Sequence, residues 1–109
     1  AQPDRGLNRA DLAIAYLRMA RATGEASWYL LAEQSAQQAL LKLPQHPEAI
    51  AVLARVAEAR HDFAAALQWA AQIPASRDAL GIQTTANLAI GNLAAADRAA
   101  TALVDQTLS

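Results

Sequence analysis

The stretch HDFAAA at residues 61–66 returns as GNLAAA at residues 91–96. Each copy places an Asp or Asn, which readily caps a helix, directly before a run of apolar residues. A chain that repeats a helix start in this way is predicted to consist of stacked copies of one helical hairpin. Such a stack leaves one continuous face open, so it favours a binding surface over a catalytic pocket.

The composition around this stretch is typical of an all-α protein. The chain has 109 residues, of which 54% are hydrophobic but only 5% aromatic, and the excess is alanine. Alanine supplies helix propensity and close packing rather than bulky core volume. The length suits one hydrophobic core, so we predict a single domain over residues 1–109.

Charge and cysteine content exclude several classes of protein. The formal net charge is -1 and no cluster of Lys and Arg interrupts the balance, which argues against nucleic acid as a partner. The absence of cysteine excludes disulfides and thiolate metal sites. No apolar run is long enough to span a bilayer, so we expect a soluble chain without direct membrane insertion.

The sequence does not decide in which cellular compartment the protein is located. The chain begins at Ala1 rather than at methionine, which fits either a processed mature form or a piece of a longer protein. A cytoplasmic and an exported, periplasmic location are therefore both retained.

Start and stop signals predict six helices. Expected N-caps are Asn8, Ser27, Asp62, Ser76 and Asn92, and Pro47 fits the first position of the third helix. Gly24 is expected to end the first helix in the left-handed conformation, while Pro44 and Pro74 stop the second and fourth. The predicted helices cover residues 9–23, 28–43, 47–60, 63–73, 77–90 and 93–108.

The middle hairpin resembles a known family. The residues that carry the resemblance are Pro47-Glu48-Ala49, Leu53-Ala54, Ala57, His61-Asp62-Phe63, Ala66 and Ala70. Their order of small and large side chains is similar to that of the tetratricopeptide repeat (TPR). The resemblance implies a right-handed α-solenoid of three helical hairpins, or six antiparallel helices, with repeats at about 8–45, 46–75 and 76–108.

Departures from the family spacing predict an irregular stack. The first hairpin holds extra residues around Arg21 to Ser27, so it should be elongated. The fourth helix should lack about one turn before Pro74, because the spacing from Ala66 to Ala96 is short of the family's period.

Alanines are expected where the helices cross. A methyl side chain allows helix axes to approach closely, and aromatic neighbours then supply most of the buried apolar area. The crossing alanines are Ala13, Ala32, Ala54, Ala66 and Ala96, and the neighbours are Tyr16, Trp28, Tyr29, Phe63 and Trp69. Trp28 is either packed in this way or exposed as an anchor for a partner.

No residue pattern points to catalysis, a metal or a cofactor. His46 and His61 lie at opposite ends of the third helix, too far apart for one ion, and are interpreted as loop and cap residues. The serines occur in no nucleophile elbow and have no His-Asp pair beside them. We therefore expect a protein that is not an enzyme.

The TPR resemblance implies that the first helix of each hairpin lines a concave wall. The lining carried over from the family is Ala10, Ile14, Leu17 and Arg18, then Glu48, Ala51, Val52, Arg55 and Glu58, then Asp78, Ile82, Thr85 and Leu88. The family's Lys and Asn for gripping a terminal carboxylate do not occur at these positions. The residues predicted to contact a partner are Ile14, Leu17, Arg18, Arg55, Glu58, Ile82, Thr85 and Leu88.

Two functions remain open from the sequence. The first is a protein-interaction adaptor that holds an amphipathic helix or apolar peptide, with an acidic residue near Arg18 or Arg55. The second is a structural or self-association module of a larger protein or complex, whose exposed apolar surfaces pack on a second copy or on the rest of a longer polypeptide, with no free ligand groove. Leu103, Val104 and Leu108 leave the last helix without a polar outer side, so a homo-oligomer, a partner chain or a further segment could cover it.

Overall fold

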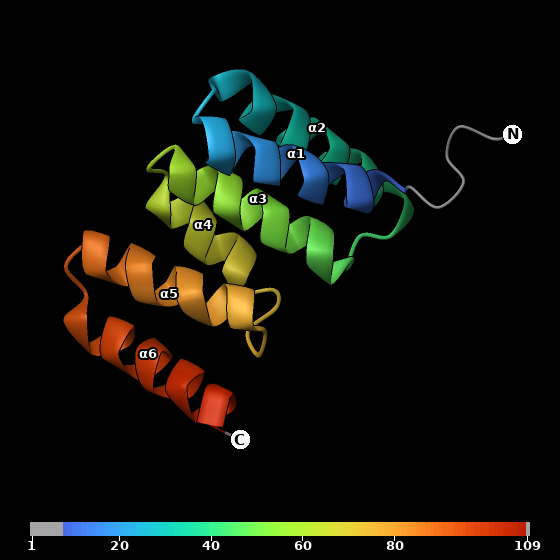
Figure 1. The fold of residues 1–109 in the computed structure, drawn as a ribbon. Helices are drawn as coiled ribbons and strands as arrows, with labels where there is room; N and C mark the ends of the chain where they lie inside the picture. Colours follow the sequence, from blue (N-terminus) through green and yellow to red (C-terminus); the bar gives the residue numbers. More distant parts are fainter. Residues whose placement is uncertain (1–7, 109) are drawn as a thin grey trace, which may run out of the picture.

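A computed structural model describes residues 8–108 and shows an all-α protein (Figure 1). Six helices occur within these residues. They are α1 (Arg9–Thr23), α2 (Ala26–Lys42), α3 (Pro47–Ala59), α4 (Phe63–Ala70), α5 (Arg77–Ala89) and α6 (Leu93–Leu108). The first pair is the longest, with 15 and 17 residues against 13 and 8 in α3 and α4, as the extra residues before Ser27 predict.

The helices pack as sequential pairs. Each helix contacts the next one along the chain, and α3 also contacts both α1 and α5. Among the described residues, α2 does not contact α4, and α6 packs on α5 alone. Figure 1 shows α1, α3 and α5 following one another down the molecule, with α6 at the end remote from α1. The overall dimensions are 50 × 30 × 23 Å.

Most helix starts follow the sequence prediction. The Asn8 side chain accepts a hydrogen bond from the Asp11 amide, and Asp11 accepts one from the Asn8 amide in return. Asp62 and Ser76 each accept from the amide three residues ahead, and Gly24 ends α1 at φ 73°. These bonds satisfy amides that the helix itself leaves without partners.

Two predicted boundaries are wrong. Ser27 does not cap α2, because the helix already begins at Ala26, and Glu25 at the cap position makes no side-chain bond to the helix. Helix α4 ends at Ala70 rather than at residue 73, so the chain leaves the helix well before Pro74. Helix α4 is thus three residues shorter at its C-terminal end than the sequence predicts.

The two copies of the opening stretch form the same turn. His61 and Gly91 both have positive φ, 61° and 85°. The amides of Asp62 and Asn92 donate to the carbonyls five residues earlier, over 2.9 and 2.8 Å. Their side chains then accept from Ala65 and Ala95, each over 3.2 Å. The repeated sequence therefore encodes a repeated ending of one helix and start of the next.

The core is built largely from alanine. All five predicted crossing alanines are buried, with exposed fractions between 0 and 3%. One cluster joins α1, α2 and α3, a second joins α3, α4 and α5, and Trp69 packs against both. Trp28 is half-buried with its ring 6.0 Å from that of Tyr16, so it packs within the first pair rather than standing free as an anchor.

No helix within residues 8–108 is long and apolar enough to cross a membrane.

Candidate functional site

A hollow of about 270 Å³ lies across α1, α3 and the first turn of α5. Its lining residues are Ile14, Leu17, Arg18 and Arg21 of α1, Glu48, Ala51, Val52 and Arg55 of α3, and Asp78 of α5. Apart from Arg21, the sequence analysis places all of these residues on the predicted wall. The helices that carry them touch one another directly, which brings side chains from distant parts of the sequence together.

A second hollow continues the first. It measures about 130 Å³ and shares Leu17, Arg21 and Arg55 with its neighbour, while Tyr29, Glu58 and Ala59 complete its lining. The two together form what we call the groove, defined by the residues that line these two hollows. Its apolar surface comes chiefly from Ile14, half-buried on α1, and from Ala51 on α3. An apolar wall with charged edges suits an amphipathic ligand.

The charges of the groove are arranged by helix. Arg18 and Arg21 are exposed on α1, and neither forms an ion pair within the part of the chain that the structure describes. Glu48, on α3, and Asp78, on α5, supply negative charge to the same lining. The α1 edge of the groove is therefore basic, which favours a ligand that carries a carboxylate.

Arg55 belongs to an internal network rather than to this free edge. Its Nη1 lies 3.3 Å from Oε1 of Glu58, and its Nη2 lies 3.4 Å from Oδ1 of Asp78. The Thr85 hydroxyl donates to the other oxygen of Glu58. Since Arg55 and Glu58 belong to α3 whereas Asp78 and Thr85 belong to α5, the network joins the two helices across the floor of the groove.

A glycine makes room for this network. A Cβ atom added to Gly81 would lie 3.3 Å from Nη2 of Arg55, closer than most such contacts. Gly81 thus lets the guanidinium lie against the backbone of α5. An arginine held by two carboxylates and packed in this way positions α5 against α3, so it is a poor candidate for the residue that reaches out to a partner.

The α5 part of the predicted wall lies differently from expectation. Ile82 has no exposed surface and packs in the core cluster with Ala54 and Ala66, so it cannot contact a partner in this conformation. Thr85 is exposed, and its hydroxyl donates a hydrogen bond to the Glu58 carboxylate. Leu88 is 54% exposed yet lines neither hollow of the groove. The prediction for Ile82 is wrong because its turn of α5 faces α3 and α4.

The two histidines have the structural roles expected of them. His46 caps α3 by accepting the Ala49 amide at Nδ1, and His61 occupies the left-handed turn before α4, with its ring stacked on that of Phe63. Within residues 8–108, no three residues of the metal-binding types form a group that could hold an ion.

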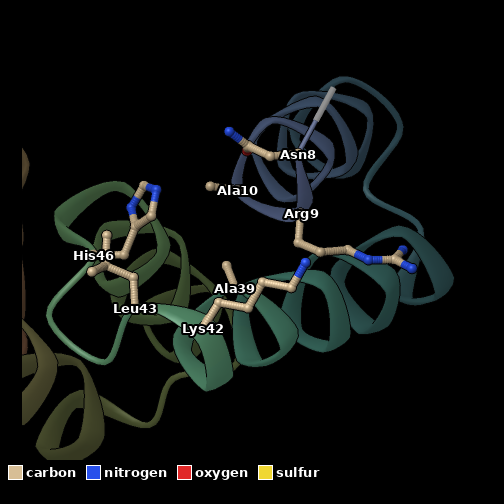
Figure 2. A pocket seen from close by; sticks show the side chains of 7 residues that line it. All are labelled: Asn8, Arg9, Ala10, Ala39, Lys42, Leu43 and His46. Carbon is tan, nitrogen blue, oxygen red and sulfur yellow. The ribbon is translucent and has the colours of Figure 1, made fainter. Parts of the chain in front are cut away.

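One further pocket lies outside every site that the sequence predicts. It measures about 340 Å³ and lies where the start of α1, the end of α2 and the start of α3 meet (Figure 2). Its lining includes Arg9, Lys42 and His46. No sequence motif indicates this pocket, because its residues come from three separate helix ends.

Comparison of the chain with models of known protein families, with curated proteins and with solved structures finds no match. The case for a function therefore rests on the geometry of the groove and of the packing that forms it.

Proposed function

We propose that this chain is a non-enzymatic adaptor that binds an amphipathic helix or peptide of another protein in the groove formed by α1, α3 and α5. The single observation that carries the proposal is the hollow on these three helices, which unites an apolar wall with unpaired arginines. The proposal includes a TPR-like architecture, a right-handed α-solenoid of three hairpins.

The order of helix contacts supports this architecture. The first helices of successive pairs touch each other, α1 with α3 and α3 with α5, whereas α2 and α4 do not touch. Such an order places first helices on the inner, more tightly packed side and second helices on the outer side of a curved stack. The identical turns before α4 and α6 supply the repeated local geometry that a solenoid needs.

The chemistry of the groove specifies the kind of ligand. Ile14 and Ala51 offer apolar contact, whereas Leu17 and Val52 are 9 and 2% exposed and add little to it. Arg18 and Arg21 lie next to this wall and favour a ligand with a carboxylate, which can accept hydrogen bonds from a guanidinium. We therefore propose a helix whose apolar side chains lie on the wall and whose Glu or Asp reaches Arg18.

Reversing the charge of Arg18 should weaken the binding of a peptide in the groove. A displayed library of amphipathic helices with glutamate at the polar positions supplies ligands, and the affinity of the selected peptides is measured by titration calorimetry. Arg18→Glu is expected to weaken binding at least about tenfold, because it replaces a charge-assisted contact by repulsion.

Arg98→Glu is the matched control, because it makes the same charge change at an exposed position on α6, outside the groove. It should leave the affinity unchanged. Selected peptides that bind Arg18→Glu as tightly as the original chain would contradict the groove as their site.

The outer side of α6 supports a second candidate function, self-association. Leu93, Val104 and Leu108 are 66, 54 and 80% exposed, and α6 contacts α5 alone among the described helices. A second copy of the chain offers the same apolar surface, so two copies related by a two-fold axis could cover both. The proposed contact is α6 against α6 of the second copy.

Light scattering over a range of concentrations tests this second candidate. The chain is expected to gain mass toward that of a dimer as concentration rises, and Val104→Asp should keep it monomeric by placing a charge in the apolar contact. Gln38→Asp, exposed on α2 away from α6, serves as the control. A constant monomer mass for the original chain would refute self-association through α6.

A further inference from the structure

The pocket shown in Figure 2 is separate from the groove and has different chemistry. It shares no lining residue with either hollow of the groove. The floor contains Ala10 and Ala39, which are 2 and 6% exposed, and Leu43 adds a further apolar side chain. Its volume of about 340 Å³ is at the small end of the range for ligand pockets, which is roughly 300 to 1,000 Å³.

Every charged residue in the lining of this pocket is basic. Arg9 and Lys42 line it, and neither pairs with a carboxylate within residues 8–108. Of the nearby carboxylates in the described part of the chain, Asp11 closes the capping box of α1, and Glu48 lines the groove rather than this pocket. The pocket therefore has positive charge that nothing in the described part of the chain neutralises.

The side chains surround the hollow from two sides. Figure 2 shows His46 on one side and Lys42 with Arg9 on the other, with Ala10 and Ala39 between them; the Arg9 guanidinium points away from the hollow. The Nδ1 atom of His46 accepts the Ala49 amide, which fixes the ring and leaves Nε2 as a donor. Lys42 is thus the group placed to hold an anion, and His46 faces it across Ala10 and Ala39.

We propose that this pocket binds a small organic monocarboxylate. The carboxylate would accept a hydrogen bond from Nζ of Lys42 on one side of the hollow, and its short apolar tail would cover Ala10, Ala39 and Leu43 toward His46 on the other side. The ligand needs both its carboxylate and its apolar tail. A bare anion leaves the apolar floor in contact with water, and a neutral apolar molecule leaves the Lys42 ammonium without a carboxylate. The site does not depend on the groove or on its proposed ligand.

Titration of the full chain, labelled with ¹⁵N, tests this site with three probes: hexanoate, 1-pentanol and inorganic phosphate. Hexanoate should give saturable shifts of amide signals around Lys42, Leu43 and Ala49. The other two probes should bind at least about tenfold more weakly than hexanoate. Shifts of equal affinity with pentanol or with phosphate, or no saturable shift with hexanoate, would overturn the proposal.

Variants of Lys42 complete the test. Lys42→Gln should weaken hexanoate binding about tenfold, the loss expected for one charge-assisted hydrogen bond, and Lys42→Arg should keep it. Arg98→Gln, which removes a charge of the same sign at an exposed position of α6 outside the pocket and the groove, is the control and should leave hexanoate affinity unchanged. Circular dichroism establishes that each variant is folded. Equal hexanoate affinity of Lys42→Gln and the original chain would contradict the assignment.

Discussion

Replacing Ile82 by alanine should lower the free energy of unfolding by about 2 to 5 kcal/mol. Ile82 has no exposed surface and packs among Ala54, Ala66 and Ala86, so truncation leaves a cavity between α5 and its neighbours. The alanines around it have no longer side chains with which to fill that space. Since small domains are stable by only about 5 to 15 kcal/mol, this change alone should be visible in a denaturant melt.

Leu88→Ala is the control for Ile82→Ala. Leu88 lies on the same helix but is 54% exposed, so its truncation should cost well under half as much. The comparison also separates the two roles assigned to α5. If Ile82→Ala left stability unchanged and reduced binding of peptides to the groove, Ile82 would be a wall residue, as the sequence analysis predicted, and the packing described above would be wrong.

Replacing Ala66 by leucine should destabilise the fold by about 1 to 3 kcal/mol, because the added atoms overpack a helix crossing. Ala66 is fully buried on α4, which lies between α3 and α5 and contacts both. The larger side chain must force one of these neighbours away. Denaturant melts of the variant and the original chain measure the loss.

Two further variants sharpen this test. Ala64→Leu changes an exposed residue of the same helix and should be close to neutral. Ala96→Leu places the same strain at the equivalent turn of α6 and should cost less than Ala66→Leu, because α6 packs against α5 alone. Equal stability of Ala66→Leu and the original chain would show that close approach at alanine does not govern the stacking.

Much of the fold could be predicted because the signals are local. Asn8, Asp62 and Ser76 cap helices through bonds to amides three residues away, and the repeated stretch at 61–66 and 91–96 makes the same turn twice. The periodic alanines also identify the buried side of each helix. These features need no knowledge of distant contacts, so the sequence alone is enough to predict them.

The features that sequence reasoning missed depend on distant contacts. Arg55 looked like a free anchor, but Glu58 and Asp78 hold it, and Asp78 belongs to another helix. The spacing of Ile82 fits a groove wall and a core equally well, and only the direction in which α5 lies decides between them. The basic pocket at Lys42 forms from three helix ends and has no signature along the chain.

We propose that the first helices of the three sequential helix pairs form the surface on which another polypeptide binds. The measurement that tests it most directly is amide hydrogen exchange of the chain with and without a peptide selected from the helix library. We predict new protection on the groove side, in α1 around residues 14–21 and in α3 around residues 48–55. Protection confined to α6 or to the outer side of α2 would contradict the claim.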